Sequence, residues 1–419
     1  MSFRIVLFLL ILLVLDLYVF QGVKFLAANK SSQSQRILYL VYWGFTILFV
    51  AFILFVLFTG WHTWPKMIRS YSFALLVIIY LSKIFVTVFL LLDDVVRVVE
   101  LAYNWIITRA HASTGNESNE AFRISRHSFL VKTGFVLAAV PFFSLLYGMI
   151  NGAYNYRIHK LSVRFPSLPD AFAGLKIVQI SDLHTGSFMG TKHLETAVEL
   201  ILKQKPDVIF FTGDLVNDRH VEALEFRETL AKLKAPIGVY SILGNHDYGD
   251  YYQWPSIEEK HENLEMLKQF QRDLGWKLLL NEHTYIEKDG EKIGLIGVEN
   301  YSGHRNFSRY GDMKKSVAGF EKQAVNILLS HDPSHWDAEI KSTYPYVDLT
   351  LSGHTHGFQY GIEIGKIKWS PVQYMYKQWA DLYEENGQKL YVNRGLGFIG
   401  YPGRVGILPE ITVFTLQKA

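Results

Sequence analysis

The sequence contains no cysteine among its 419 residues. This absence excludes disulfide bonds, thiolate metal ligands and thiol nucleophiles, although it leaves the cellular compartment open. Internal repeats, a phosphate-binding P-loop and a dinucleotide-binding fingerprint are also missing, and residues 394–397 resemble a glycine-rich turn only weakly. The chain is therefore not expected to use sulfur chemistry or a glycine-rich nucleotide site.

Excess positive charge is lacking in the C-terminal part of the chain. Residues 1–151 hold twelve Lys and Arg against six Asp and Glu, whereas the remainder holds 30 against 33. The net charge of +3 therefore comes from the N-terminal part. No nucleic-acid partner is expected for the C-terminal part.

Four long apolar runs occupy the N-terminal part, at residues 3–23, 37–59, 71–92 and 129–150. Each is long enough to cross a hydrocarbon core of about 30 Å as a helix. A cleavable signal peptide has one short apolar core, so several long runs predict a permanent anchor. We expect an all-α transmembrane domain over residues 1–155, followed by a soluble domain over residues 156–419.

Two of the apolar runs contain a charged residue. Asp16 lies in the first and Lys83 in the third, where an unpaired charge costs several kcal/mol. We expect the two side chains to face each other as a structural ion pair. The alternative is a transport or signalling role.

Residues 93–128 form the longest loop expected in the membrane part. The first half has a helical apolar pattern that predicts an interfacial amphipathic helix, and residues 113–120 predict a flexible run. A solvated connector is the alternative. The expected loops 24–36 and 93–132 carry eight Lys and Arg near the span ends, against six on the opposite side. This bias places the C-terminal domain outside the cytoplasm of a bacterial inner membrane.

A second feature favours the same orientation. Residues 125–130 resemble a twin-arginine export signal in which His127 replaces the second arginine. A coincidental basic flank is the alternative reading.

The C-terminal part alternates short apolar strands with helical segments. Expected strands at 175–180, 208–212 and 237–243 are each followed by a helical pattern, at 191–204, 221–233 and 257–274. This order is typical of βαβ units and a mainly parallel sheet. Later strands are expected at 276–280, 283–287, 292–299, 325–330, 347–352, 390–393 and 411–416. Two stacked sheets covered by helices, an α/β fold, would hold this number of elements.

Polar residues follow five of the apolar strands. The blocks are 181–184, 213–214, 244–247, 331–332 and 353–356. Open α/β sheets place their chemistry at the carboxyl ends of strands. Carboxylate, imidazole and carboxamide groups gathered at one sheet edge predict a metal site.

Hydrolysis of a phosphoester or a phosphoanhydride suits such a site. Two divalent ions about 4 Å apart neutralise the phosphoryl oxygens and generate a bridging hydroxide. Asp214 suits the bridging carboxylate between them. Mixed His, Asp and Asn ligation favours Mn²⁺, Fe²⁺ or Zn²⁺ over Ca²⁺. His246 suits a general acid beside the metals, with Asp247 to orient it or to cap the next turn.

These blocks resemble the calcineurin-like metallophosphoesterase superfamily in order and spacing over residues 170–418. The matching motifs are Asp182-x-His184, Gly213-Asp214, Gly244-Asn245-His246-Asp247, His331 and Gly353-His354-x-His356. The resemblance implies a four-layer αββα sandwich. It also implies one metal held by Asp182, His184, Asp214 and His356, and a second held by Asp214, Asn245, His331 and His354. His246 would protonate the leaving oxygen.

The end of the chain suggests a branch of that superfamily. Residues 391–397 and 409–412 resemble the closing motifs of membrane-anchored or exported bacterial members, a branch that includes UDP-2,3-diacylglucosamine pyrophosphatases. That branch usually has Gly-Gly-Gln after the double histidine. Here Gly357-Phe358-Gln359 places an aromatic ring at the rim of the site.

Three residues are candidates for binding substrate. Arg394 is suited to a bidentate clamp on a phosphate, and His304 and Arg305 lie in a loop that is expected near the site. Ordinary surface or packing roles are the alternative for all three. The aromatic-rich residues 369–383 are expected to form either an acyl-binding wall or a packed edge of the core.

The leading hypothesis is a membrane-anchored, dinuclear metal-dependent hydrolase of phosphoesters or pyrophosphates. A lipid-linked substrate such as UDP-2,3-diacylglucosamine would explain the anchor, because enzyme and substrate then diffuse in the same plane. The alternatives are a broad-specificity phosphodiesterase or phosphoprotein phosphatase, and a membrane receptor or scaffold with a metal-loaded binding domain. The presence of His246 argues against the scaffold, because a binding module needs no acid.

Overall fold

The computed structural model describes residues 3–59, 64, 66–110, 120–305, 307–365 and 367–419. The chain divides into two compact units, Met1–Leu146 and Tyr147–Ala419. The expected flexible run at 113–120 lies outside the described residues, except for residue 120. The domain boundary expected between residues 155 and 156 stays a prediction.

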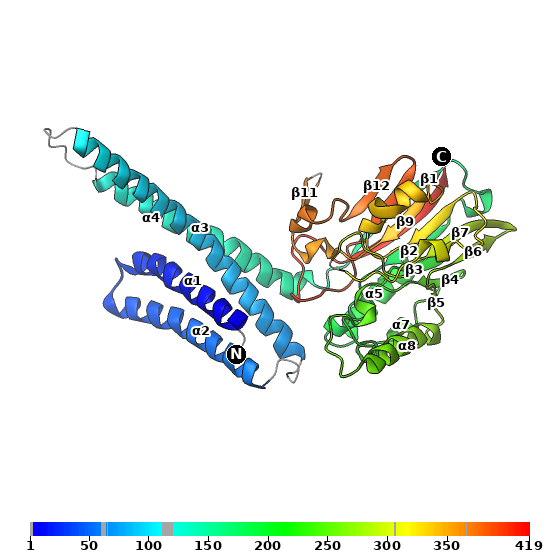
Figure 1. The fold of residues 1–419 in the computed structure, drawn as a ribbon, viewed down its shortest axis with the longest axis horizontal. Helices are drawn as coiled ribbons and strands as arrows, with labels where there is room; N and C mark the ends of the chain where they lie inside the picture. The colour runs from blue at the N-terminus through cyan, green and yellow to red at the C-terminus, as the bar shows by residue number, and fades with distance from the viewer. Residues whose placement is uncertain (1–2, 60–63, 65, 111–119, 306, 366) are drawn as a thin grey trace. The chain divides into compact units, whose positions relative to one another are not determined.

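The first unit consists of long apolar helices. They are α1 (Phe3–Ala27), α2 (Ser32–Thr59), α3 (Lys66–Ala110) and α4 (Glu120–Tyr147), labelled in Figure 1. Among the described residues, four helical segments are long and apolar enough to cross a membrane: Val6–Ala27, Ser32–Val56, Met67–Ile107 and His127–Gly152. They contain or overlap the four predicted spans, which confirms an all-α membrane part.

The third helix is longer than expected. α3 continues without interruption through the predicted span at 71–92 and through the following amphipathic pattern. The helix predicted after residue 92 is confirmed as a helix, but it continues α3 and does not begin a loop; its interfacial position stays a prediction. No turn-forming residue separates the two patterns, so a single helix of 45 residues forms.

Asp16 and Lys83 form the expected ion pair, which supports a structural role. The Asp16 side chain is buried, and its Oδ2 also accepts a hydrogen bond from Tyr80 Oη at 3.0 Å. Tyr42 Oη donates to the backbone oxygen of Asp16 at 2.7 Å. These contacts join α1, α2 and α3.

Replacing Lys83 with Met is expected to lower the free energy of unfolding by about 3–5 kcal/mol, because Asp16 would stay buried without its cation. The double variant Asp16→Leu/Lys83→Met should recover most of the loss. Thermal unfolding of the purified protein in detergent measures both effects. A double variant that regains stability but loses hydrolysis would contradict the purely structural role.

His127 has partners on the neighbouring helix. Its Nδ1 lies 2.7 Å from Asp93 Oδ2, and Arg97 Nη2 lies 2.7 Å from the same oxygen. Because this cluster joins α3 to α4, it gives His127 a packing role. The export signal stays a prediction, as does the coincidental basic flank.

The second unit contains two six-stranded mixed sheets. The first has the order β1 (Arg157–Phe165), β14 (Glu410–Lys418), β2 (Lys176–Ile180), β3 (Val208–Phe211), β4 (Gly238–Ser241) and β5 (Lys277–Leu278). The second has the order β12 (Asp381–Glu385), β13 (Gln388–Val392), β9 (Leu349–Ser352), β8 (Asn326–Leu329), β7 (Glu291–Gly297) and β6 (Glu282–Lys288). Strands β2 to β5 are parallel, as are β7, β8, β9 and β13. The predicted hairpin around residues 288–291 is confirmed as β6 and β7.

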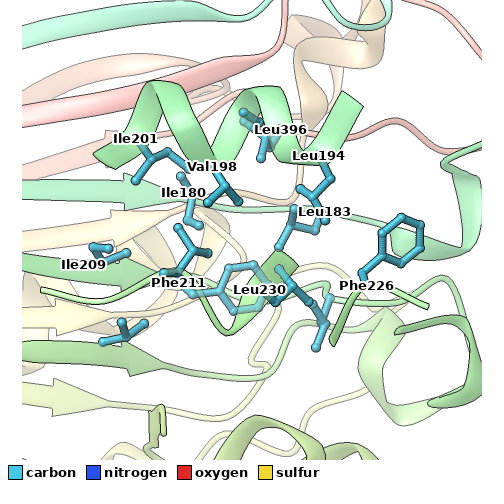
Figure 2. Packing of buried hydrophobic residues seen from close by; sticks show 14 of the residues in the cluster. Ile180, Leu183, Leu194, Val198, Ile201, Ile209, Phe211, Phe226, Leu230 and Leu396 are labelled. Atoms are coloured by element: carbon cyan, nitrogen blue, oxygen red, sulfur yellow. The ribbon is translucent and has the colours of Figure 1, made fainter. Parts of the chain in front are cut away.

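Alternating side chains of these strands fill separate layers of core. In β3, Ile209 and Phe211 pack with the helices α5 (Lys192–Lys203), α7 (Arg227–Leu230) and α8 (Ile257–Asp273). Val208 and Phe210 point to the opposite face, because side chains of a strand alternate, and pack between the two sheets. Figure 2 shows Leu194, Val198 and Ile201 of α5 above Ile180, Ile209 and Phe211.

Helical segments also cover the outer face of the second sheet. They are α9 (Met313–Ser316), the π-helical turn Trp336–Ile340 and α10 (Lys341–Thr343). Trp336 and Ile340 pack there with Leu328 and Val392. The order helices, sheet, sheet, helices confirms the α/β sandwich expected from the sequence.

Candidate metal centre

The predicted ligands lie in loops at the carboxyl ends of parallel strands. Strands β2, β3 and β4 are neighbours in the first sheet, and β8 and β9 are neighbours in the second. Asp182 and His184 follow β2, Asp214 follows β3, Asn245 follows β4, His331 follows β8, and His354 and His356 follow β9. Five short loops from two sheets therefore supply all seven side chains.

Five of these residues have a left-handed backbone. Asp182, His184, Asp214, His354 and His356 have φ between 48° and 74°. Such a conformation is uncommon for residues other than glycine and costs about 1–3 kcal/mol at each position. Strain of this kind clusters at functional sites, where the surrounding structure holds it.

A close approach between two loops explains Gly353. A Cβ atom at this position would lie 2.2 Å from Asp182 Oδ2. The next residue, His354, donates its backbone N–H to both carboxylate oxygens of Asp182 at 3.0 Å. Glycine therefore lets the loop after β9 approach the loop after β2.

One group of ligand atoms consists of Asp182, His184 and His356. These side chains are buried, and their ligand atoms lie within 4.8 Å of one another. His184 Nε2 lies 2.9 Å from His356 Nε2, which lies 3.4 Å from Asp182 Oδ1. Two neutral imidazole nitrogens can lie this close to each other when the lone pairs of both point at the same cation.

A second group consists of Asp214, His331 and His354. His331 Nε2 lies 3.1 Å from Asp214 Oδ2, and Asn245 Oδ1 lies 2.7 Å from His354 Nδ1. The same Asp214 oxygen is 3.5 Å from His184 Nε2 of the first group. One carboxylate oxygen is therefore close to both groups.

Burial keeps most of the imidazoles neutral, which is the form that binds metals. It lowers the pKa of His184 to about 3 and that of His354 to about 4, and it holds the pKa of His356 well below its usual range. Neutral imidazole nitrogen and carboxylate oxygen form a donor set that suits Mn²⁺, Fe²⁺ or Zn²⁺.

Asp214 and His331 influence each other strongly. Burial favours a neutral Asp214, but the charges of His331 and the neighbouring histidines and a hydrogen bond from His331 together outweigh it and lower the pKa of the carboxyl group. Burial likewise opposes a charge on His331, yet Asp214 raises the pKa of that imidazole to about 10. Burial raises the pKa of Asp182 to about 6. The site thus concentrates negative charge on Asp214.

His246 lies beside the two groups and belongs to neither. Its Nδ1 is 2.7 Å from the backbone oxygen of Asn217, so Nδ1 carries the proton that is donated to this carbonyl. Its ring packs edge-on to His184 at 4.9 Å and against Tyr251 at 4.6 Å. Its backbone N–H donates to Asp214 Oδ1 at 2.9 Å.

The position of Asp247 differs from the expectation that it orients His246. Its Oδ2 accepts hydrogen bonds from the backbone N–H groups of Gly244 and Asp214, both at 2.9 Å, and its Oδ1 accepts one from Leu215 at 2.8 Å. Burial and the nearby Asp214 raise its pKa to about 7. Asp247 therefore ties the loop after β4 to the loop after β3, and the carbonyl of Asn217 is the partner that orients His246.

Replacing Asp247 with Asn is expected to lower the free energy of unfolding by about 1–3 kcal/mol, because the amide nitrogen would leave buried N–H groups without an acceptor. Metal affinity should fall as well. Thermal unfolding and metal titration measure the two effects, with Asp273→Asn on the exposed end of α8 as the control. Unchanged stability with a slower chemical step would instead indicate direct action on His246.

Arg394 is surrounded by carboxylates. Its guanidinium group is buried and lies 2.5 Å from Glu410, 2.7 Å from Glu363 and 2.8 Å from Asp381. Ion pairs with three acidic residues of the protein neutralise this cation, so it is not free to bind a phosphate. We therefore assign Arg394 a structural role in place of the expected phosphate clamp.

The other two substrate candidates lie in the loop of residues 301–310. The His304 ring contacts the ring of Tyr376 at 4.6 Å, and Arg305 is exposed. Phe307 of the same loop contacts the His354 ring at 4.8 Å. The loop thus reaches the rim of the metal centre, and both candidates remain proposals.

Two tyrosines beside the site were not anticipated. Tyr376 Oη lies 2.8 Å from His354 Nε2, and Tyr251 Oη accepts a hydrogen bond from Asn245 Nδ2 at 2.9 Å. Neither residue stands in a polar block after a strand, which was the signal that identified the metal ligands. The aromatic-rich stretch that includes Tyr376 was the one indirect indication.

Comparisons with known proteins agree with this geometry. The family model for "Probable Calcineurin-like phosphoesterase, transmembrane domain" matches residues 1–153, and the model for "Calcineurin-like phosphoesterase" matches residues 175–358. The chain is 32% identical over 263 residues to the uncharacterized metallophosphoesterase YkuE of Bacillus subtilis, which covers 61% of this chain and 84% of that protein.

Two further relatives also match this chain. The transmembrane protein with metallophosphoesterase domain of Danio rerio is 28% identical over 65% of this chain and 60% of its own length. The phosphodiesterase YaeI of Escherichia coli is 27% identical over 70% of this chain and 99% of its own length.

Proposed function

Because this chain belongs to the calcineurin-like metallophosphoesterases, we propose that it uses two divalent metal ions to hydrolyse a phosphodiester or pyrophosphate bond of a lipid-linked substrate. It is a membrane protein with a phosphoester-hydrolysing domain. We propose three further features: the number of metal ions, the residue that acts as general acid, and the lipid character of the substrate.

The position of Asp214 carries the two-metal proposal. One of its oxygens lies 3.1 Å from a nitrogen of the second ligand group and 3.5 Å from a nitrogen of the first. A shared carboxylate is what two neighbouring cations require. Asp182, His184 and His356 would complete one site, and Asn245, His331 and His354 the other. When bound, the two ions would neutralise the phosphoryl oxygens and activate water.

His246 is proposed to supply the proton to the leaving oxygen. The hydrogen bond from its Nδ1 to the Asn217 carbonyl fixes the orientation of the ring. The proton available for transfer is therefore the one on Nε2 when the imidazole is charged. An acid beside the metals, and not on them, keeps this proton free for transfer.

The transmembrane helices support a lipid-linked substrate such as UDP-2,3-diacylglucosamine. Four candidate spans hold the hydrolase at a bilayer, where a lipid substrate is concentrated in two dimensions. A soluble phosphodiester offers no reason for this anchor. A bacterial inner membrane with the hydrolase domain outside the cytoplasm remains part of the proposal.

Turnover by the full-length protein in lipid nanodiscs with Mn²⁺ tests the proposal. We expect hydrolysis of bis-p-nitrophenyl phosphate, and a higher kcat/KM for UDP-2,3-diacylglucosamine than for a UDP-sugar without acyl chains. Equal values for the two UDP compounds would point to a broad-specificity phosphodiesterase. No turnover of any of these compounds would favour the metal-loaded scaffold.

A further inference from the structure

A small hairpin lies next to the metal centre, outside the two large sheets. It consists of β10 (Ile362–Ile364) and β11 (Ile367–Trp369), and a short helix, η8 (Pro371–Tyr374), follows it. Figure 1 draws β11 apart from the strands of the sandwich. Tyr376, just after this segment, lies 2.8 Å from His354 Nε2, and Ser370 Oγ donates to the Gly357 carbonyl at 2.8 Å. The segment that follows the hairpin is thus attached to the rim of the site at both contacts.

The hairpin has one polar face and one apolar face, and their orientation is the reverse of the usual one. Glu363 opposes Lys368 on one face, whereas Ile362 opposes Trp369 and Ile364 opposes Ile367 on the other. On a water-exposed hairpin that packs on a protein, the apolar face is expected to point inward and the polar face outward.

The polar face is the one that points into this protein. Glu363 lies 2.7 Å from the buried Arg394, and Lys368 pairs with Asp381 and donates to the Ala380 carbonyl at 2.8 Å. The apolar face is left outside: Ile364 is 71% exposed and Ile367 is 67% exposed. Ion pairs therefore hold the hairpin with its isoleucines outward.

Neighbouring elements extend this apolar surface. Between residues 157 and 419, twelve large apolar side chains are exposed among the described residues, and six of them fall within residues 358–375. These six are Phe358, Ile362, Ile364, Ile367, Tyr374 and Met375, here called the rim patch. An apolar concentration of this kind marks a site of association.

The chemistry of the rim patch fits a bilayer surface. It combines aliphatic side chains with Tyr374, whose hydroxyl accepts a hydrogen bond from Trp369 Nε1 at 3.4 Å, and such amphipathic rings prefer the membrane interface. The same chain carries four candidate membrane spans among its described residues, so the domain that bears the hairpin is tethered to a bilayer.

We propose that the rim patch inserts into the boundary between headgroups and acyl chains, with the β10–β11 hairpin as the inserted element. The rim of the metal centre would then open at the lipid surface. This inference depends on membrane anchoring and not on the lipid character of the substrate, so it goes beyond the proposed function.

Single-cysteine labelling of the full-length protein tests the insertion. Because the native sequence has no cysteine, Ile364→Cys and Ile367→Cys each give one labelling site for an environment-sensitive fluorophore. Ile257→Cys, at the start of α8, is the matched control, since Ile257 is 69% exposed and is not one of the six residues of the rim patch. The proteins are reconstituted in vesicles with and without lipids brominated in the acyl chain.

We expect labels at positions 364 and 367 to emit at shorter wavelength and to lose emission in brominated lipids, while remaining protected from iodide. The label at position 257 should be quenched by iodide only. Labels at 364 and 367 that keep their full emission in brominated lipids would overturn the proposal, whether water or protein surrounds them. The readout requires no turnover, so it stays informative if the proposed substrate is wrong.

Discussion

Replacing Asp214 with Ala is expected to remove both metal ions together and to reduce hydrolysis to the uncatalysed rate. The reason is the shared position of its carboxylate, which lies close to a histidine of each ligand group. Losing it removes one ligand from each site and the charge that holds the two cations next to each other. Metal content of the purified protein, measured by mass spectrometry, and the rate with bis-p-nitrophenyl phosphate report the two losses.

Asp207→Asn is the matched control. Asp207 lies just before β3, at the end opposite to Asp214, and its carboxylate accepts a hydrogen bond from the Lys176 backbone at 2.8 Å. This variant should keep two metals and its activity. A full equivalent of metal retained by Asp214→Ala would contradict the bridging role.

Replacing His246 with Ala is expected to leave both metals bound and to lower kcat by roughly 10²–10⁴-fold, the usual contribution of a general acid. The loss should depend on the leaving group. A p-nitrophenolate leaves readily without a proton, whereas an alkoxide does not, so the loss should be larger for a substrate with an alkyl leaving group. The ratio of the two kcat values measures this dependence.

His261→Ala, on the surface of α8, controls for the loss of an imidazole elsewhere in the domain. It should change neither rate. An equal loss for the two leaving groups in the His246 variant would remove His246 from proton transfer. Unchanged turnover would reject any catalytic role.

Much of the metal centre follows from local sequence. The ligands stand in polar blocks that follow short apolar runs, and such runs fold into strands whose carboxyl ends carry the chemistry of α/β sheets. The expected single sheet edge is wrong, however, because Asp214 follows a strand of the first sheet and His331, 117 positions later, follows a strand of the second. The meeting of the two edges, the distances between ligands and the left-handed backbone of five ligand residues are not predictable, because tertiary packing imposes them.

The contacts of Asp247 and Arg394 could not be predicted from the sequence. The group that orients His246 is a backbone carbonyl, which no side-chain pattern reveals. Arg394 looked available for phosphate because its carboxylate partners, Glu363, Asp381 and Glu410, stand elsewhere in the chain. The sequence alone does not tell whether a charged residue in a loop motif is free to bind a substrate or belongs to a buried ion pair.

The edges of the sheets were also missed. β1 was not expected, because Arg157–Phe165 mixes polar and apolar residues, as an edge strand does, and its partner β14 lies at the far end of the chain. The β10–β11 hairpin escaped notice for a different reason. Its isoleucines alternate with charges as in a surface strand, and only the ion pairs show which face points outward.

Anomalous diffraction from crystals of the Mn²⁺-loaded protein tests the metal centre most directly. Two anomalous peaks are expected about 3.5–4 Å apart, the spacing of two-metal sites, with Asp214 between them. Asp182, His184 and His356 should surround one peak, and Asn245, His331 and His354 the other. A single peak, or peaks that do not share Asp214, would contradict a dinuclear centre built from these seven side chains.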